Sequence, residues 1–349
     1  MRQTLATPAL ALAAAVAQVL AQDLNQTIVG CVELGCPASS LDSANDNCTV
    51  ADTGSFPYVG LTRVSANTSS SSSPSGLSWV KGVNVTDSSS SSSSSNSSRT
   101  FHSSFYLGAP AATPLNASTG ACAVFLRGAE AWNMSFGTSA NATGEAAQGT
   151  CASAMGASCV SALLARAQAQ ILSYYGGSGE APSVADACER LRQDLVNSTL
   201  DACVSVSKGS WTNFTAVALT GDGAPEPISQ QENSSSTCWP VTPKEDSLTL
   251  VTEFTTPGTD LVADAEESFW AITPILTVFY PMENGTAVSA VDASLSCVKA
   301  VGPALASIDT IDNGTDDQDN GANAISSSYH FATAASCVVA AVLFALYTT

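Results

Sequence analysis

Histidine and basic residues are scarce in this sequence, and their scarcity excludes several classes of function. The 349 residues include 2 histidines and 11 lysines and arginines against 30 aspartates and glutamates, which gives a net charge of −19. A chain with this much negative charge repels nucleic-acid phosphates and anionic lipid headgroups. We therefore expect neither nucleic acid nor an anionic membrane surface as a partner. A solvated acidic surface accounts for the charge.

The N-terminus carries a short apolar run with the features of a cleaved signal. Arg2 precedes an apolar stretch over 5–20 that ends in small or modest residues. This pattern predicts a secretory signal peptide at 1–21, and we expect the mature chain to begin at Gln22.

The C-terminus carries a second pattern of processing. Small residues at 320–322 are followed by a polar spacer at 323–330 and an apolar tail at 331–347. This order predicts a GPI-attachment signal, with the lipid on Asn320 and residues 321–349 removed on maturation.

The alternative for the same tail is a transmembrane helix, which needs about 20 apolar residues and usually has Lys or Arg on its cytoplasmic side. The tail at 331–347 is shorter, and no Lys or Arg follows Lys299. The sequence therefore favours a GPI anchor over a membrane-spanning helix.

The cysteines support the same processing. The sequence has 11 cysteines, of which Cys337 alone lies in the C-terminal signal, so an even number remains. An even number is expected of an oxidised, secreted domain, although the sequence does not choose the pairing. The expected disulfide cysteines are Cys31, Cys36, Cys48, Cys122, Cys151, Cys159, Cys188, Cys203, Cys238 and Cys297.

Glycosylation signals run through the whole sequence. An Asn-x-Ser/Thr motif without proline marks an acceptor asparagine that must lie on the surface when it is occupied. The predicted sites are Asn25, Asn47, Asn67, Asn84, Asn96, Asn116, Asn133, Asn141, Asn197, Asn213, Asn233, Asn284 and Asn313. We therefore expect sugar over nearly every part of the surface.

The sequence lacks the usual patterns of metal and nucleophile chemistry. It has no Cys-x-x-Cys pair, and only His102 lies in the expected mature chain, so we expect no zinc site, no other metal and no cofactor. It has no Gly-x-Ser-x-Gly motif, and a Ser-His-Asp triad would have to be built around His102 alone. Because His102 lies among strand-forming residues, we expect a structural role for it and assign no catalytic residue.

Two short motifs imitate known sites. The tetrapeptide Asp-Thr-Gly-Ser at 52–55 matches that of aspartic proteases, but the second copy that supplies the other carboxylate is missing, so we expect a turn. The acidic run before Gly321 imitates a calcium loop, but Gln318 and Ser327 stand at its third and twelfth positions, where ligands are needed. We expect that run to be a solvated stalk.

Carbohydrate chemistry has two candidate sets of residues. Glycoside hydrolysis needs two carboxylates that flank a sugar, and Glu253 and Glu283 are the acids that we consider first. Sugar binding uses exposed indole rings, whereas tryptophans more often pack in the core; among the 5 tryptophans we take Trp239 and Trp270 as the candidates for exposed rings.

The composition divides the chain into segments. We expect one disulfide-bonded, glycosylated ectodomain over 22–300, with serine-rich loops at 66–76 and 87–99. An acidic stalk at 301–320 leads to the anchor. The alternative is a separate module at 22–65 that is linked by serine tracts to the rest.

Hydrophobic periodicity predicts an α+β fold. From Cys151 to Tyr175 apolar residues recur at helical spacing and predict one helix, with Val160, Leu164, Ala167, Ile171 and Tyr175 on its buried face. A second helix follows Ser183 as its N-cap and carries the apolar stripe Val184, Cys188, Leu191 and Leu195, so we expect the two helices to pack as an antiparallel pair. The sequence predicts strands at 77–85, 101–107, 123–126, 248–255, 275–280 and 291–297, with a hairpin turn at Asn284-Gly285 between the last two. In the strand at 248–255 we expect Leu248, Leu250, Thr252 and Phe254 to share one face. We expect an antiparallel sheet or sandwich with an inserted, disulfide-linked helical pair.

Signal peptide, serine-rich and sequon-rich ectodomain, paired cysteines, acidic stalk and GPI signal together resemble the fungal GPI-anchored cell-surface and cell-wall glycoproteins. The resemblance rests on this layout and on no ectodomain family. It implies residence on the extracellular face of the plasma membrane, or transfer of the trimmed anchor to wall β-glucan.

The function that we expect is a noncatalytic structural or interaction role. The alternatives are a carbohydrate-binding or adhesive module and a wall-remodelling glycosidase. The expected partners are the membrane, through the GPI lipid, and wall polysaccharide.

Overall fold

The structure is a computed structural model that describes residues 48–50, 54–65, 74–87, 98–111, 115, 118–127, 134–136, 149–175, 182–198, 200–207, 213–234, 236, 239–259, 264, 268–282 and 290–301. These residues belong to the unit Met1–Asp312. Several predictions lie outside them: the signal peptide, Cys31, Cys36, Cys238, Asn25, Asn47, Asn67, Asn96, Asn116, Asn133, Asn141, Asn284, Asn313, Asp52, Glu283, the stalk beyond Val301, Asn320 and the C-terminal signal.

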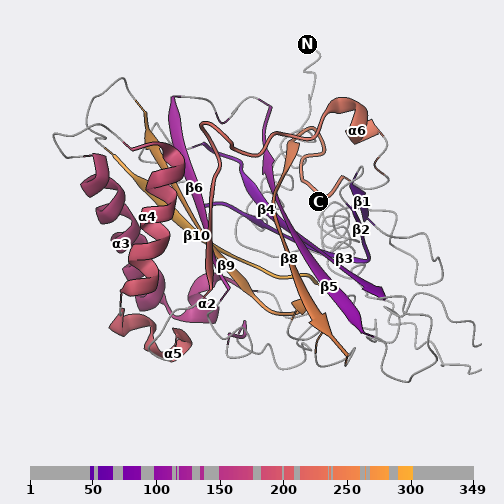
Figure 1. The fold of residues 1–349 in the computed structure, drawn as a ribbon, viewed down its shortest axis with the longest axis horizontal. Coiled ribbons are helices and arrows are strands. Elements are labelled where there is room, and N and C mark those ends of the chain that lie inside the picture. Colours follow the sequence, from indigo (N-terminus) through magenta and orange to yellow (C-terminus); the bar gives the residue numbers. More distant parts are fainter. Residues whose placement is uncertain are drawn as a thin grey trace, which may run out of the picture. The chain divides into compact units, whose positions relative to one another are not determined.

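Two four-stranded antiparallel sheets form the body of the described fold (Figure 1). Sheet I has the order β3-β4-β5-β8, and its strands are β3 (Tyr58–Arg63), β4 (Ser78–Asp87), β5 (Arg99–Ala109) and β8 (Ser247–Gly258). Sheet II has the order β10-β9-β6-β7, and its strands are β10 (Asp292–Val298), β9 (Thr273–Pro281), β6 (Thr119–Leu126) and β7 (Phe214–Ala218). Strands β1 (Cys48–Val50) and β2 (Gly54–Phe56) pair antiparallel in a separate two-stranded sheet, and the turn expected between them at Asp52 lies outside the described residues.

The two sheets pack face to face through aromatic side chains. Phe105 of sheet I and Phe125 of sheet II meet edge to face with centroids 5.2 Å apart, and Trp79 meets Phe125 at 5.5 Å. The Trp79 indole also donates a hydrogen bond of 3.0 Å to Thr277 Oγ1 on β9. Because Trp79 and Phe105 are buried, this layer is the central core of a β-sandwich.

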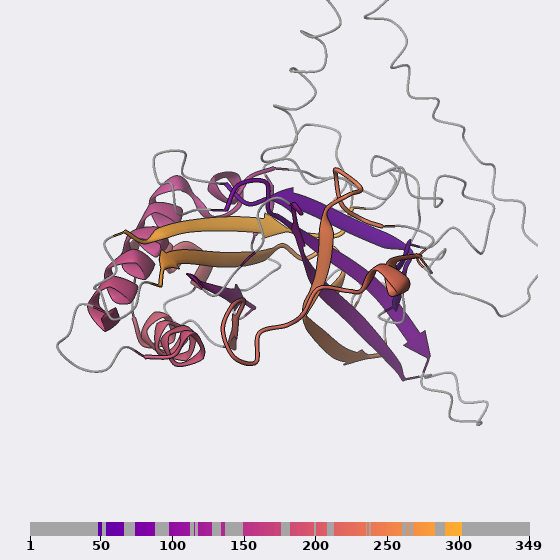
Figure 2. The ribbon, with the colours of Figure 1, turned by 90° about the horizontal axis from the view of Figure 1, so that it is seen from above.

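The opposite face of sheet II is covered by helices (Figures 1 and 2). Thr150 caps α2 (Cys151–Met155), and Gly156, with φ of 86°, separates it from α3 (Ala157–Tyr175). The single helix predicted from Cys151 to Tyr175 is therefore wrong at this point, because the backbone conformation of Gly156 breaks it. Within the described residues, no helix is long and apolar enough to cross a membrane.

The second long helix, α4 (Val184–Asn197), begins as the sequence predicts. Ser183 Oγ accepts a hydrogen bond of 3.1 Å from the Asp186 backbone N–H, which satisfies an orphan donor of the first turn. Arg166 of α3 donates to the carboxylate of Asp194 on α4 at 2.7 and 2.5 Å. Because the middle of α3 meets the end of α4, the two helices form the antiparallel pair that was expected.

Shorter helices complete the described fold: a 3₁₀ turn (Asp201–Cys203), α5 (Val204–Ser207) and α6 (Gln230–Ser234).

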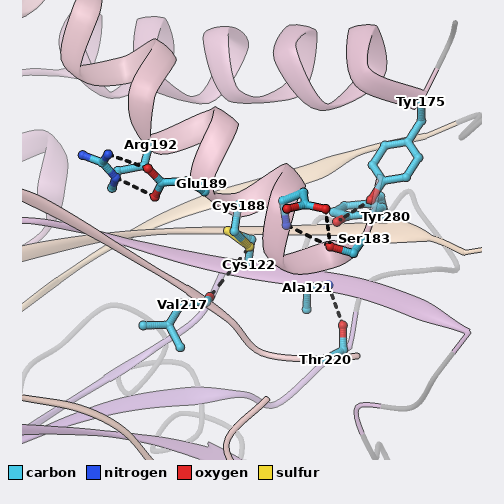
Figure 3. The surroundings of a disulfide bond; sticks show 11 residues. Ala121, Cys122, Tyr175, Ser183, Cys188, Glu189, Arg192, Val217, Thr220 and Tyr280 are labelled. Carbon is cyan, nitrogen blue, oxygen red and sulfur yellow. Dashed lines mark hydrogen bonds and ion pairs between the residues drawn. A yellow bond between two sulfur atoms is a disulfide. The ribbon is translucent and has the colours of Figure 1, made fainter. Parts of the chain in front are cut away.

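Three disulfides lie in the described residues, and two of them tie helices to sheet II. Cys188 of α4 is bonded to Cys122 of β6 (Figure 3), and Cys151 of α2 is bonded to Cys297 of β10. The third joins Cys159 of α3 to Cys203. The fold class is thus confirmed as α+β, with antiparallel sheets and disulfide-linked helices.

Strand β8 departs from the alternation that the sequence suggests. The β5–β8 register shifts between Phe105 and Tyr106, because β8 carries one extra residue there. Leu248 consequently packs on the outer face of sheet I, while Val251 lies in the core between the sheets. Leu248, Leu250 and Phe254 were predicted to share one face; the β-bulge moves Phe254 to the other.

Candidate functional site

A groove of about 550 Å³ lies along strand β10, and we call it the β10 groove. Its lining comprises Thr62, Arg63, Ser65, Gly149, Thr150, Cys151, Ala152, Val160, Ser161, Leu164, Ala165, Gln168 and the consecutive residues 292–297. Successive side chains of a strand point to opposite faces. A run of consecutive lining residues therefore means that the groove follows the backbone edge of β10 and not one of its faces.

The groove lies where the edges of the two sheets separate. Strand β10 ends the strand order of sheet II, and β3 ends that of sheet I. The two edges meet at an isolated bridge between Val59 and Val301. Farther along, the groove is lined by Arg63 at the end of β3, by Ser65 just after it and by Leu295 on β10. Val301 was predicted to begin the stalk, but it is buried and pairs with the fold.

Helix α3 forms a wall of the groove with residues that were expected in the core. The prediction placed Val160 and Leu164 on the buried stripe, but both are half-buried and line the groove. The buried stripe is instead Cys159, Leu163, Ala167, Ile171 and Tyr175. The buried face is thus rotated around the helix axis relative to the prediction, so that it includes Cys159, whose position is fixed by its disulfide to Cys203.

A buried hydroxyl in the groove lacks a hydrogen-bond partner. Ser294 is 5% exposed, and its Oγ makes no hydrogen bond. An unsatisfied buried polar group costs about 1–3 kcal/mol, which a ligand with a donor or an acceptor would recover. The nearby Arg63 guanidinium, by contrast, already donates to the backbone oxygens of Gly76 and Thr242.

The predicted glycosylation sites within the described residues avoid this groove. Asn197 and Asn213 are exposed, and Asn84 and Asn233 are half-buried, so all four can carry sugar. No asparagine belongs to the groove lining.

The structure brings two sequence candidates, His102 and Glu253, together on the outer face of sheet I. His102 Nδ1 lies 3.4 Å from Glu253 Oε1, and His102 Nε2 lies 3.0 Å from Thr86 Oγ1. Ser104 donates a hydrogen bond of 2.7 Å to Glu253 Oε2. The order hydroxyl, imidazole, carboxylate is that of a catalytic triad.

This polar cluster nevertheless has the setting of a cross-strand ladder. Its members come from neighbouring strands of one open sheet face, and the side chains of His102 and Glu253 are 24% and 40% exposed. None of them lines the β10 groove. Such cross-strand polar pairs stabilise a sheet by about 0.2–1 kcal/mol each, and this agrees with the structural role expected of His102.

Both tryptophans that were expected to be exposed lie in the core. Trp239 is 8% exposed and donates a hydrogen bond of 2.8 Å to the Asp246 backbone oxygen. Trp270 is 7% exposed and meets Tyr58 edge to face at 5.0 Å. Sugar stacking needs an open ring face. Both rings are instead covered by hydrophobic packing, so neither is available to a glycan in this fold.

A buried amine is an electrostatic feature that the sequence did not signal. Lys81 is buried between the sheets, and its Nζ donates to the backbone oxygens of Ser268, Phe269 and Ala271 at 2.9, 3.3 and 3.1 Å. Burial, with smaller contributions from the positive charges of Lys299 and Arg127, lowers the pKa of Lys81 to about 7. Lys81 thus anchors the 268–271 segment against sheet I.

The described part of the chain contains no cluster of three or more His, Cys, Asp and Glu side chains that could hold a metal. Comparison with known proteins finds no matching family model, no matching curated protein and no matching solved structure. The β10 groove and its lining are therefore the basis on which function is inferred.

Proposed function

We propose that this protein is a GPI-anchored extracellular glycoprotein of the cell surface or wall that acts as a noncatalytic interaction module. The β10 groove carries the proposal. It combines an open strand edge, apolar side chains on α3 and one buried, unpartnered hydroxyl, which together suit a ligand that is held in place.

The disulfides and the sequence signals support the extracellular part of the proposal. Cys122–Cys188 and Cys151–Cys297 fix helices to sheet II, and disulfides of this kind persist in oxidising compartments. The predicted signal peptide and GPI signal give the same location.

A cell-surface assay tests the location. The full chain is expressed in a fungal host, and intact cells are treated with phosphatidylinositol-specific phospholipase C or with β-glucanase. Release by the phospholipase indicates membrane residence, and release by the glucanase indicates transfer to the wall. Recovery of the protein inside the cell would contradict the proposal.

A second assay tests the noncatalytic role. The purified ectodomain, residues 22–320, is incubated with β-glucan, chitin and mannan, and bound protein and released sugar are measured together. We expect no released sugar. Steady release of oligosaccharide would establish an enzyme and refute the proposal.

A further inference from the structure

The geometry points to a strand that is missing between the two sheets. We propose that the β10 groove takes one extended, basic peptide segment of a partner protein, which pairs with the outer edge of β10 and fills the gap between β10 and β3. This inference rests on the proposed interaction role and names the chemical class of its partner.

The edge of β10 has the properties of a pairing template. Its residues pair with β9 in unbroken register from Asp292 to Val298, and no strand among the described residues pairs with its other edge. Natural sheets protect such edges with lysine, proline or a bulge. The sequence Asp-Ala-Ser-Leu-Ser-Cys-Val contains none of these, so nothing in the part of the chain that the structure describes blocks strand addition at this edge.

The position of the edge explains why one strand is the right occupant. Strands β3 and β10 are the terminal strands of their sheets, so a strand added to the outer edge of β10 would meet no other strand of sheet II. Sheets I and II are joined at the Val59–Val301 bridge and are separated beyond it by the groove. A peptide inserted there pairs with β10 where the direct pairing of the two edges stops.

The size of the groove favours a peptide over a second copy of this chain. Residues 292–297 offer an edge of about 20 Å at the usual rise of a strand. A stable dimer needs about 800 Å² from each subunit, which is more than one strand edge about 20 Å long supplies. An edge of this length, set between α3 and the end of β3, matches one extended segment.

The lining and the charge define the chemistry of the peptide. Val160, Leu164 and Leu295 supply apolar contacts for one face of the strand, and Ser294 Oγ lies ready to bond to it. The chain carries a net charge of −19, whereas the lining holds one acidic residue, Asp292, and one basic residue, Arg63, so the attraction for positive charge comes from the chain as a whole. This field attracts positive charge, so basic residues should flank the apolar positions of the peptide.

The test uses the purified ectodomain, residues 22–320, and a random peptide library as the probe. We expect enrichment of basic peptides rich in β-branched residues. Binding of these peptides should slow hydrogen exchange at residues 292–297 and should weaken about tenfold or more in Ala165→Arg, which fills the groove from an exposed position on α3.

Two further variants keep the result interpretable. Ser173→Arg adds the same side chain at an exposed position of α3 that does not line the groove, and it should bind the peptides as the wild type does. Ser294→Ala removes the unpartnered hydroxyl without adding bulk, and we expect binding to weaken.

Three outcomes would overturn the inference. The first is that no peptide is enriched, and the second is that enriched peptides bind Ala165→Arg as tightly as the wild type. The third is dimerisation that Ala165→Arg abolishes, which would make a second copy the occupant. None of these outcomes alters the results expected in the surface-release and sugar-release assays, so a failure of this inference can be told apart from a failure of the proposed function.

Discussion

The buried amine of Lys81 should make the stability of this protein rise with pH through the mildly alkaline range. Burial lowers the pKa of Lys81 from the ordinary lysine value of 10.5 to about 7 in the folded state. Between these values the unfolded chain binds a proton that the folded chain does not, so protonation favours unfolding. The penalty is fully present below pH 7 and disappears as pH rises toward 10.5.

The magnitude follows from the two pKa values. Raising the pH from about 7.5 to about 9.5 should increase the free energy of unfolding by about 2–3 kcal/mol through this group alone. Tyrosines act in the opposite direction, because burial raises the pKa of Tyr175 and Tyr280 above the usual value of 10.0. Their effect begins near pH 10, so the range below about 9.5 isolates the lysine.

The assay is urea unfolding of the ectodomain at several pH values, for the wild type and for Lys81→Met. Methionine keeps the length of the side chain but cannot titrate, so the variant should lose the rise with pH. It also leaves three backbone oxygens at 268, 269 and 271 without their donor, which lowers its stability at every pH. Parallel pH profiles of the two proteins would refute the reasoning.

Three further predictions concern the core and the polar cluster. Trp270→Ala should lower the free energy of unfolding, measured by chemical denaturation, by about 3–5 kcal/mol, as expected for a buried aromatic side chain. A variant as stable as the wild type would mean that the ring is exposed. Glu253→Gln should change the free energy of unfolding by less than about 1 kcal/mol, since the Glu253 side chain is 40% exposed. The variant should also leave sugar release at its background level, and a loss of measurable hydrolysis would instead make Glu253 a catalytic acid. Replacing Cys122 and Cys188 together by alanine should cost about 2–4 kcal/mol in calorimetry, and an unchanged melting temperature would contradict the bond.

Local periodicity predicted most of the elements because it depends on neighbours in the sequence. The stripe of Val184, Cys188, Leu191 and Leu195 on α4 is buried as expected, and the strand pair on either side of the second serine tract forms as β4 and β5. Each of these elements buries one continuous stripe or face, and its residues alone show which.

The errors occur where tertiary structure decides. The bulge in β8 changes which face Phe254 occupies, and no residue type announces it. Trp239 and Trp270 stand near charged or loop residues in sequence, yet distant strands cover them. The β10 groove forms where the edges of two sheets separate, which local periodicity does not show. The one signal that the sequence offers is a strand without lysine or proline to protect its edge.

The bond between Cys151 and Cys297 would have a mechanical consequence under the GPI anchorage that we propose. Cys297 precedes the last described residue, Val301, by a few positions, so tension on the chain from an anchor beyond it reaches this disulfide almost at once. The covalent link passes that load into α2 and leaves the preceding part of β10 unstretched. Pulling from the C-terminus should therefore break the Val59–Val301 bridge while the β10–β9 ladder holds, and added reductant should let the ladder peel at lower force.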